Sequence, residues 1–442
     1  MILTTEPLDK SRGSSLSGEI RPPGDKSISH RALILASLAS GRSSIEGLLD
    51  SEDVRATADA CRQLGMTSSR QGQTLLINGV GSEGFSAPLA PLDMGNSGTA
   101  MRLLAGVLAA QPFRSVLVGD VSLSRRPMRR IVRPLALMGA RIQTTESGTP
   151  PLVIEGNAHL KGIEFESPVA SAQVKSCVLL AGLYAQGRTC VSEPRKSRDH
   201  TEKMLPSFGI PMESGCSVAG GKSLSAARIQ VPGDISSAAF FLVAAAMIPG
   251  SAMLLRDVGL NETRNGIVHV LQAMGADLAV ENQRLYGEEA VGDIRLRHGG
   301  RLEGIDIPPE WIPSLIDELP AIMALAAVSG GTTRIRGAEE LRVKESDRIA
   351  VMARGLETLG VRLQEYPDGI DIEGGAIGGG VVDAAGDHRC AMSFCILGQL
   401  AAGAVTVTGS EAIATSYPGF VHDLIAAGGN ITSERVEPSI IL

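Results

Sequence analysis

Three side chains that can bind an anion lie close together in the segment 24–31, which reads Gly-Asp-Lys-Ser-Ile-Ser-His-Arg. The stretch that follows, 32–39, is apolar or small throughout, so it predicts a buried helix. The first turn of a helix carries unpaired N–H groups and a partial positive charge. Lys26, Ser27 and Arg31 add donors there, so this helix start suits a phosphate or a carboxylate. It is not a P-loop, because Asp25 rather than glycine precedes the lysine.

Polar residues recur at the starts of other small-residue helices. Such helices are expected at 28–40, 97–110, 171–186, 235–248, 319–329 and 389–402. Serine, threonine, asparagine and aspartate are common N-caps, so these residue types alone do not indicate a ligand. Lysine, arginine and glutamine are not explained by capping, so they indicate an anion site. The residues at the other five starts are Asn96, Ser97, Gly98 and Thr99; Ser171, Ala172 and Gln173; Asp234, Ser236 and Ser237; Asp317 and Glu318; and His388 and Arg389.

Three charged clusters lie between these helix starts. The run 125–130 contains Arg126 and opens a second helix, where cations oppose the helix dipole unless an anion is present. In the run 342–348, helical spacing places Lys344 and Arg348 on one side, with Glu345 within reach of Arg348. The run 198–202 mixes charges at another helix start. A solvated face, a surface salt-bridge ladder and a capping segment remain the alternative interpretations of the three runs.

A repeated unit positions these residues. Each small-residue helix is followed by a short β-type run and by a more charged helix that ends at a glycine, and two alternating strands complete most units. The glycines suit the left-handed residue that closes many helices. Six βαβαββ units divide into two groups of three, so the buried helices of each group are expected to expose their starts on one face. The closing glycines are Gly65, Gly139, Gly209, Gly275, Gly360 and Gly428.

Composition narrows the class of protein. The chain has 442 residues, which favours two domains, and 52 glycines with 3% aromatic residues favour close helix packing through small side chains. A net charge of −7 argues against nucleic acid as the partner. The six cysteines and seven histidines show no metal-ligand spacing, so no metal is expected. Without a signal sequence or an apolar run long enough to span a bilayer, the expected location is the cytoplasm.

Four motifs together resemble one family, the 5-enolpyruvylshikimate-3-phosphate synthases. They are 24–31, 95–102, 342–348 and 387–389, and they match in order. The shorter motifs 24–26, 171–175, 198–202 and 261–264 resemble the second class of these enzymes. The resemblance implies an α/β fold with two similar domains, each of three βαβαββ units with buried parallel helices, known as the inside-out α/β barrel of the enolpyruvyl transferases. It also implies one discontinuous domain formed by 1–22 and 234–442, a second formed by 23–233, and an active site in the cleft between them.

The family's reaction would explain why the helix starts carry cations. The resemblance implies a transferase that moves the enolpyruvyl group of phosphoenolpyruvate to the 5-hydroxyl of shikimate 3-phosphate and releases phosphate. This is a step of the shikimate pathway to chorismate and the aromatic amino acids. Two anionic substrates in one cleft require converging cations and N–H groups. No cofactor is implied, and a monomer is expected.

Residue roles follow from the same resemblance. Glu345 would protonate the vinyl carbon, and either Asp317 or Lys26 would take the hydroxyl proton. The implied ligands of shikimate 3-phosphate are Lys26, Ser27, Arg31, Ser171, Ala172, Gln173, Arg198, Asp317 and Lys344. Those of phosphoenolpyruvate are Lys26, Asn96, Gly98, Arg126, Gln173, Lys344, Arg348, His388 and Arg389.

Two residues depart from the pattern of the first class, and the rival functions fit the sequence less well. Thr415 stands where the first class has a lysine, and Ala172 replaces a serine, as in the second class, which includes glyphosate-tolerant enzymes. One rival is a sister enolpyruvyl transferase acting on a UDP-amino sugar, but no cysteine lies near 125–130. The other rival is a noncatalytic anion-binding scaffold, which would gain little from the carboxylates of Asp317 and Glu345.

Overall fold

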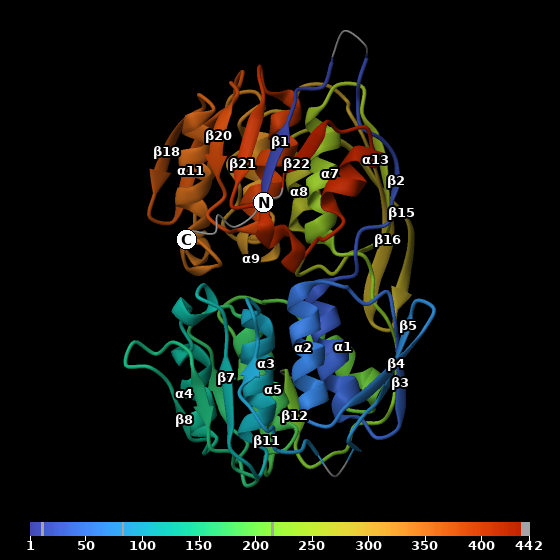
Figure 1. The fold of residues 1–442 in the computed structure, drawn as a ribbon, viewed down its shortest axis with the longest axis vertical. Helices are drawn as coiled ribbons and strands as arrows, with labels where there is room; N and C mark the ends of the chain where they lie inside the picture. Colours follow the sequence, from blue (N-terminus) through green and yellow to red (C-terminus); the bar gives the residue numbers. More distant parts are fainter. Residues whose placement is uncertain (10–12, 82–83, 214–215, 435–442) are drawn as a thin grey trace, which may run out of the picture. The chain divides into compact units, whose positions relative to one another are not determined.

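The chain forms two compact units in the computed structural model, which describes residues 1–9, 13–81, 84–213 and 216–434. Unit 1 comprises Met1–Pro23, Gly233–Arg284 and Ala290–Leu442, and unit 2 comprises Gly24–Pro232 and Leu285–Glu289. In Figure 1 residues 24–232, coloured blue through green, make up most of unit 2, whereas the dark-blue N-terminal segment and the yellow-green to red part belong mainly to unit 1. Each unit has its own hydrophobic core.

Unit 2 contains three successive repeats. The elements of the first are α1 (Lys26–Leu38), β3 (Arg42–Glu46), α2 (Glu52–Gln63), β4 (Thr67–Gln71) and β5 (Thr74–Asn78). Those of the second are β6 (Leu92–Asp93), α3 (Gly98–Ala109), β7 (Ser115–Val118), the 3-10 helix η3 (Leu123–Arg125), α4 (Arg129–Leu137), β8 (Ile142–Gln143) and β9 (Leu152–Ile154). Those of the third are β10 (Glu164–Glu166), α5 (Ala172–Gly182), β11 (Arg188–Ser192), α6 (His200–Met204), the 3-10 helix η4 (Leu205–Phe208), β12 (Ser217–Ala219) and the closing strand β13 (Arg228–Gln230).

Unit 1 begins with two strands from the N-terminus and continues with three further repeats. Its first elements are β1 (Ile2–Thr5), β2 (Ser17–Ile20), α7 (Ile235–Met247), β14 (Ala252–Gly259), α8 (Gly266–Ala273), β15 (Asp277–Tyr286) and β16 (Glu289–Arg297). They are followed by α9 (Ile312–Leu315), α10 (Leu319–Ala326), β17 (Thr332–Ile335), the 3-10 helix η5 (Glu339–Val343), α11 (Arg348–Thr358), β18 (Arg362–Tyr366) and β19 (Gly369–Glu373). The last are β20 (Gly380–Asp383), α12 (His388–Leu397), the 3-10 helices η6 (Gly398–Leu400) and η7 (Glu411–Thr415), β21 (Val405–Thr408), α13 (Phe420–Ala426) and β22 (Ile431–Glu434).

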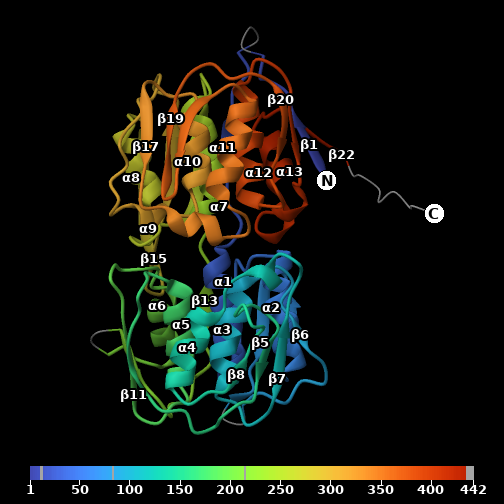
Figure 2. The same cartoon turned by 90° about the vertical axis from the view of Figure 1, so that its left-hand side faces the viewer.

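Each unit has three helices inside and its sheets outside. Helices α1, α3 and α5 form the interior of unit 2, and α7, α10 and α12 that of unit 1, as Figures 1 and 2 show. Every residue of α7 is buried, which is possible because the helix has no polar face. Small residues permit the close approach: a Cβ on Gly106 of α3 would lie 2.2 Å from the carbonyl oxygen of Cys177 on α5. The predicted packing through small residues is therefore confirmed at this contact.

The described strands form one small sheet for each repeat. In unit 2 the strand orders are β13-β3-β5-β4, β6-β7-β9-β8 and β10-β11-β12. In unit 1 they are β15-β16-β14-β2, β17-β19-β18 and β20-β21-β1-β22. Strand β13 pairs parallel with β3, while β1 lies between β21 and β22, so chain segments distant in sequence complete the sheets of both units.

The predicted α/β repeat fold is confirmed, with differences in detail. The six closing glycines all have positive φ, between 81° and 111°, as a left-handed helix end requires. The expected helix at 389–402 ends earlier, at Leu397, because η6 continues the chain with tighter turns. The strands described above form separate open sheets, so the term barrel describes the family resemblance and not a closed sheet. Among the described residues, no helix has the length and apolar character needed to cross a membrane.

Candidate active site

The start of α1 in unit 2 combines a cap with two cations. The Asp25 carboxylate caps the helix by accepting from the N–H of Ile28 at 2.8 Å. Lys26 is the first helical residue, and its Nζ lies 3.0 Å from Oδ2 of Asp53, which the sequence analysis did not single out. Ser27, in the same turn, is half-buried and accepts a hydrogen bond from Arg31 through its carbonyl oxygen.

Arg31 is buried and is held mainly by neutral groups. Its Nε donates to Oγ1 of Thr201, and its Nη2 donates to Oγ of Ser176, both at 2.7 Å. Burial lowers the pKa of this guanidinium to about 10, although the neighbouring carboxylate of Glu202 raises it. Burial, together with the charges of Lys26 and Arg31, also lowers the pKa of His30 well below its usual value. The start of α1 therefore brings Lys26 and Arg31 together with the carboxylates of Asp25 and Asp53, and His30 stays neutral there.

The start of α3 lies next to α1 and carries a second arginine. Arg126, which follows η3, is buried and donates through Nη2 to Oδ1 of Asn96 at 2.6 Å. Gly98 is the first residue of α3, and a Cβ there would lie 3.0 Å from Nη1 of Arg102 and 3.3 Å from Nη1 of Arg126. Ser97 caps the helix and lies 3.5 Å from Nε2 of His30, so the starts of α1 and α3 are adjacent.

The start of α5 completes the site residues of unit 2. Ser171 is the N-cap and Ala172 the first helical residue. Gln173 accepts from Nη1 of Arg102 at 2.5 Å and donates to Oγ1 of Thr99 at 3.0 Å, so it joins α5 to α3. Arg198 is partly exposed and precedes α6, whose Thr201 contacts Arg31. We call these residues the unit 2 group: Lys26, Ser27, Arg31, Asn96, Gly98, Arg126, Ser171, Ala172, Gln173 and Arg198.

A second group lies in unit 1, where carboxylates and cations alternate. Oδ1 of Asp317 lies 3.1 Å from Nη1 of Arg348, 3.5 Å from Nζ of Lys344 and 3.9 Å from Nε of Arg389. Glu345 pairs with Nη2 of Arg348 at 2.6 Å. Arg389 also donates to the carbonyl oxygen of Asp317 at 3.0 Å. We call this set the unit 1 group: Asp317, Lys344, Glu345, Arg348, His388 and Arg389.

Arg348 is the centre of the unit 1 group and is 1% exposed. Its Nε also donates to Oδ2 of Asp387, the cap of α12, at 2.8 Å. Burial alone would lower the pKa of Arg348, but the charges of Asp387, Glu345 and Asp317 raise it well above its ordinary value. The guanidinium therefore remains charged and fixes both Asp317 and Glu345 in place. His388 follows the cap as the buried first residue of α12.

One geometric prediction for the unit 1 group is wrong. Lys344 and Glu345 were expected on one helix with Arg348, but α11 begins only at Arg348, because η5 ends at Val343 and the next residue, Lys344, is not helical. The i,i+4 relation between Lys344 and Arg348 therefore does not apply. The pairing of Glu345 with Arg348 is nevertheless present, since the turn before the helix brings the two side chains together.

Two arginines that support the two groups, Arg102 and Arg264, were given no role from the sequence, whereas Asp234, Ser236 and Glu318 were expected at helix starts. Arg102 positions Gln173, and its place one helical turn after Gly98 is a signal that could have identified it. In unit 1, Ser236 donates to the buried carboxylate of Glu318, and Arg264 donates to Ser236 at 2.5 Å and to Asp234 at 3.1 Å. These contacts hold Glu318 next to Asp317 at the start of α10.

Comparisons with known proteins agree with this architecture. Residues 10–424 match the family model described as EPSP synthase (3-phosphoshikimate 1-carboxyvinyltransferase). A 3-phosphoshikimate 1-carboxyvinyltransferase of Xanthomonas euvesicatoria is 53% identical, with 96% of each chain covered, and one of Xanthomonas oryzae is 52% identical over 96% of this chain and 97% of the relative. The solved structure of an EPSP synthase from Acinetobacter baumannii superposes with a TM-score of 0.86 at 46% identity, covering 98% of this chain and all of that one. The chain belongs to the EPSP synthase family.

Proposed function

We propose that this chain transfers the enolpyruvyl group of phosphoenolpyruvate to the 5-hydroxyl of shikimate 3-phosphate and releases inorganic phosphate. The main support is the match to named 3-phosphoshikimate 1-carboxyvinyltransferases over nearly the full length at 53% identity. The family model, the relatives and the solved structure reported above all carry the name of this synthase, which favours it over a UDP-amino-sugar transferase and a noncatalytic scaffold.

We propose that the two groups act together, with the substrates bound in a cleft between a domain of residues 1–22 and 234–442 and a domain of residues 23–233. Each unit by itself holds only part of the residue set, which supports a shared site. Both substrates are anions, and the cations and helix starts of the unit 2 group would bind their phosphates and carboxylates. Closure around the substrates would expel water and strengthen these contacts.

Glu345 is proposed to be the acid in the first step and the base in the second. Its proton moves to C3 of phosphoenolpyruvate while the 5-hydroxyl oxygen bonds to C2, which gives a tetrahedral intermediate. In the second step a C3 proton returns to Glu345, the C2–O bond to phosphate breaks, and phosphate leaves. Negative charge brought in by the substrates competes for Lys344 and Arg348, so it favours the protonated carboxyl that the first step needs.

Asp317 is proposed as the base that removes the proton of the 5-hydroxyl. Three cations lie within 3.9 Å of its Oδ1 and favour the ionised carboxylate, which can accept a proton. The competing candidate, Lys26, is already paired with Asp53 as an ammonium group and suits the binding of a leaving phosphate better. Transfer of this proton to phosphate as it leaves would balance the reaction.

Phosphate release tests the proposed function directly. The purified protein is given shikimate 3-phosphate and phosphoenolpyruvate together, and then each alone. Release is expected only with both substrates. Release with a UDP-amino sugar in place of shikimate 3-phosphate, and none with the proposed pair, would assign the chain to the sister enzyme.

We also propose that the enzyme belongs to the second class, which includes glyphosate-tolerant enzymes, that it tolerates glyphosate, that it is a monomer and that it works in the cytoplasm. Ala172 and Arg198 support the class assignment, because they match its motifs rather than those of the first class. A glyphosate titration at fixed phosphoenolpyruvate tests it, and inhibition at micromolar concentrations would contradict it. Light scattering during size exclusion tests the monomer.

A further inference from the structure

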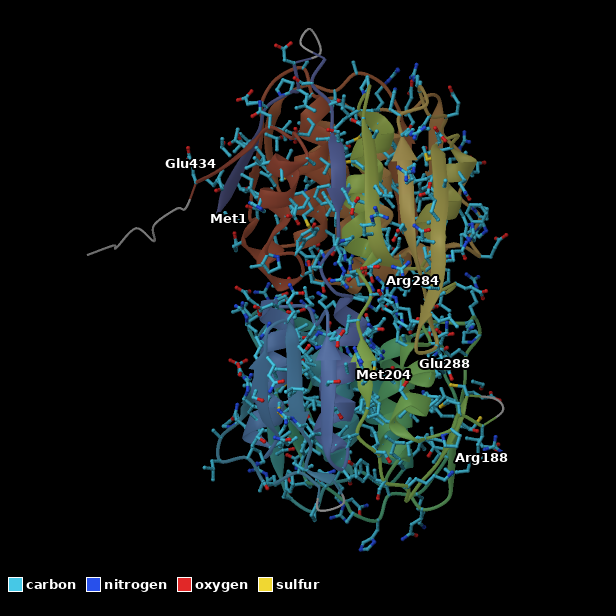
Figure 3. The ribbon with its side chains drawn as sticks, turned by 90° about the vertical axis from the view of Figure 1, so that its right-hand side faces the viewer. Met1, Arg188, Met204, Arg284, Glu288 and Glu434 are labelled. Carbon is cyan, nitrogen blue, oxygen red and sulfur yellow. The ribbon has the colours of Figure 1, made fainter. Side chains whose placement is uncertain are left out.

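The long hairpin β15–β16 links the two units at a place that the sequence motifs do not mark. Its strands belong to unit 1, whereas its tip, Leu285–Glu289, belongs to unit 2. Figure 3 labels Arg284, which directly precedes this tip, Glu288, which lies within it, and Met204, which ends α6. A Cβ on Gly287 would lie 3.5 Å from Oγ of Ser207 in η4. The tip therefore packs beside the helical segment 200–208 of unit 2.

Glu289 makes the polar contact of this tip. Its carboxylate is 8% exposed, and Oε1 lies 2.7 Å from Nδ1 of His200, which is 1% exposed. Nζ of Lys203 lies 4.0 Å from the other carboxylate oxygen. A buried carboxylate is costly unless it is paired, and a buried imidazole N–H is costly without an acceptor. The Glu289–His200 contact therefore fixes the tip against the start of α6.

The base of the hairpin is held firmly within unit 1. Asp293 accepts hydrogen bonds from Asn282 at 2.9 Å, from Arg256 at 2.8 Å and from the backbone N–H of Asp257 at 3.0 Å. Asp257 in turn accepts from Nε of Arg21 through its side chain and from the N–H of Gly233 through its carbonyl oxygen. Arg21 and Gly233 lie next to the two points where the chain passes between the units. Through Asp257, the hairpin residue Asp293 is therefore connected to both of these points.

The segment that receives the tip carries one proposed substrate ligand and contacts another. Arg198 lies two residues before His200, and Thr201 accepts from Nε of Arg31 at 2.7 Å. One residue further, Glu202 pairs with the buried Nζ of Lys175 at 2.8 Å. Three consecutive side chains thus fix the segment: His200 contacts β16, Thr201 contacts α1 and α5, and Glu202 contacts α5. The contact supplied by the hairpin is the one closest to Arg198.

Given the proposed function, we propose that Glu289 is a positioning residue for the phosphorylated substrate. Its contact with His200 fixes the start of α6 and thereby places Arg198 and Arg31 to bind shikimate 3-phosphate. The tip and the segment that it contacts both belong to unit 2, although the strands of the hairpin belong mainly to unit 1.

The variants Glu289→Ala and Glu289→Gln test this role. Loss of a buried hydrogen bond to a charged partner predicts that Glu289→Ala raises the Kd of shikimate 3-phosphate about tenfold. The KM for phosphoenolpyruvate should change less than twofold by the same reasoning, since its proposed ligands lie elsewhere. Glu289→Gln keeps an acceptor for His200 and should recover most of the affinity. Titration calorimetry with shikimate 3-phosphate alone gives the Kd without turnover.

Glu281→Ala is the matched control, because Glu281 lies on the same hairpin and pairs with Arg295 at 2.8 Å but is about one-third exposed. It should bind shikimate 3-phosphate like the wild type. The inference is overturned if Glu289→Ala binds as tightly as this control, or if it weakens both substrates equally while lowering the melting temperature, which would indicate a purely structural role. Absence of phosphate release by the wild type would instead refute the proposed function, so the two failures are distinguishable.

Discussion

The unit 2 group and the unit 1 group use arginine in different ways. In the contacts described above, Arg31 donates to hydroxyl and carbonyl oxygens and Arg126 donates to the amide oxygen of Asn96, all of which are neutral acceptors. Arg348 is surrounded by the carboxylates of Asp317, Glu345 and Asp387, so its charge is balanced within the protein. In the proposed mechanism the first arrangement would bind charged substrates, and the second would hold carboxylates in fixed positions for proton transfer.

The variant Glu345→Gln should have the largest effect and tests the unit 1 half of this comparison. A glutamine fills the same space and can still contact Arg348, but it cannot deliver a proton. Loss of general acid catalysis predicts that kcat falls by about 10² to 10⁴, with little change in the Kd of either substrate. Steady-state kinetics and calorimetry measure the two quantities.

Glu339→Gln is a suitable control, because Glu339 is exposed in η5 of the same segment and its replacement changes the net charge equally. It should leave kcat unchanged. A Glu345→Gln enzyme with normal kcat would show that the carboxylates of the unit 1 group only balance charge, and the contrast between the two groups would then fail.

Arg126→Gln tests the unit 2 half and should have a smaller effect, on binding. Removing a buried guanidinium that faces an anionic substrate predicts a rise in KM for phosphoenolpyruvate of about 10- to 100-fold, with kcat at saturation less affected. Arg125→Gln removes the same charge from an exposed neighbour and controls for long-range electrostatics. A fall in kcat at unchanged KM would assign Arg126 to chemistry and contradict the comparison.

Local patterns predicted the fold better than they predicted the contacts within the two groups. The closing glycines, such as Gly65, were predictable because a left-handed helix end is a property of a few neighbouring residues. The relation of Lys344 to Arg348 was not predictable, because it depends on a turn between η5 and α11 that the spacing of charged residues does not reveal. The contact of Glu289 with His200 joins residues 89 positions apart, and neither lies in a pattern that points to the other.

The variant Asp293→Asn tests whether a carboxylate of unit 1 outside the unit 1 group affects stability but not turnover. It should have the smallest kinetic effect of these variants. Burial alone would raise the pKa of Asp293, but hydrogen bonds from Asn282, the N–H of Asp257 and Arg256 lower it to about 2. An unfolded aspartate has a pKa of about 3.9, so the carboxylate stabilises the fold above that pH, and this stabilisation is lost as the pH falls through about 2.

Asp293→Asn should therefore lower the free energy of unfolding by about 2 kcal/mol at pH 7, and the difference from wild type should shrink as the pH approaches 2. Denaturant titrations at several pH values measure this, while kcat at pH 7 should stay within about twofold of wild type because the residue lies outside the unit 1 group. If kcat falls as far as in Glu345→Gln, then carboxylates throughout unit 1 support catalysis. In that case the carboxylates that support catalysis would extend beyond the unit 1 group, and Asp293 would not be a purely structural residue.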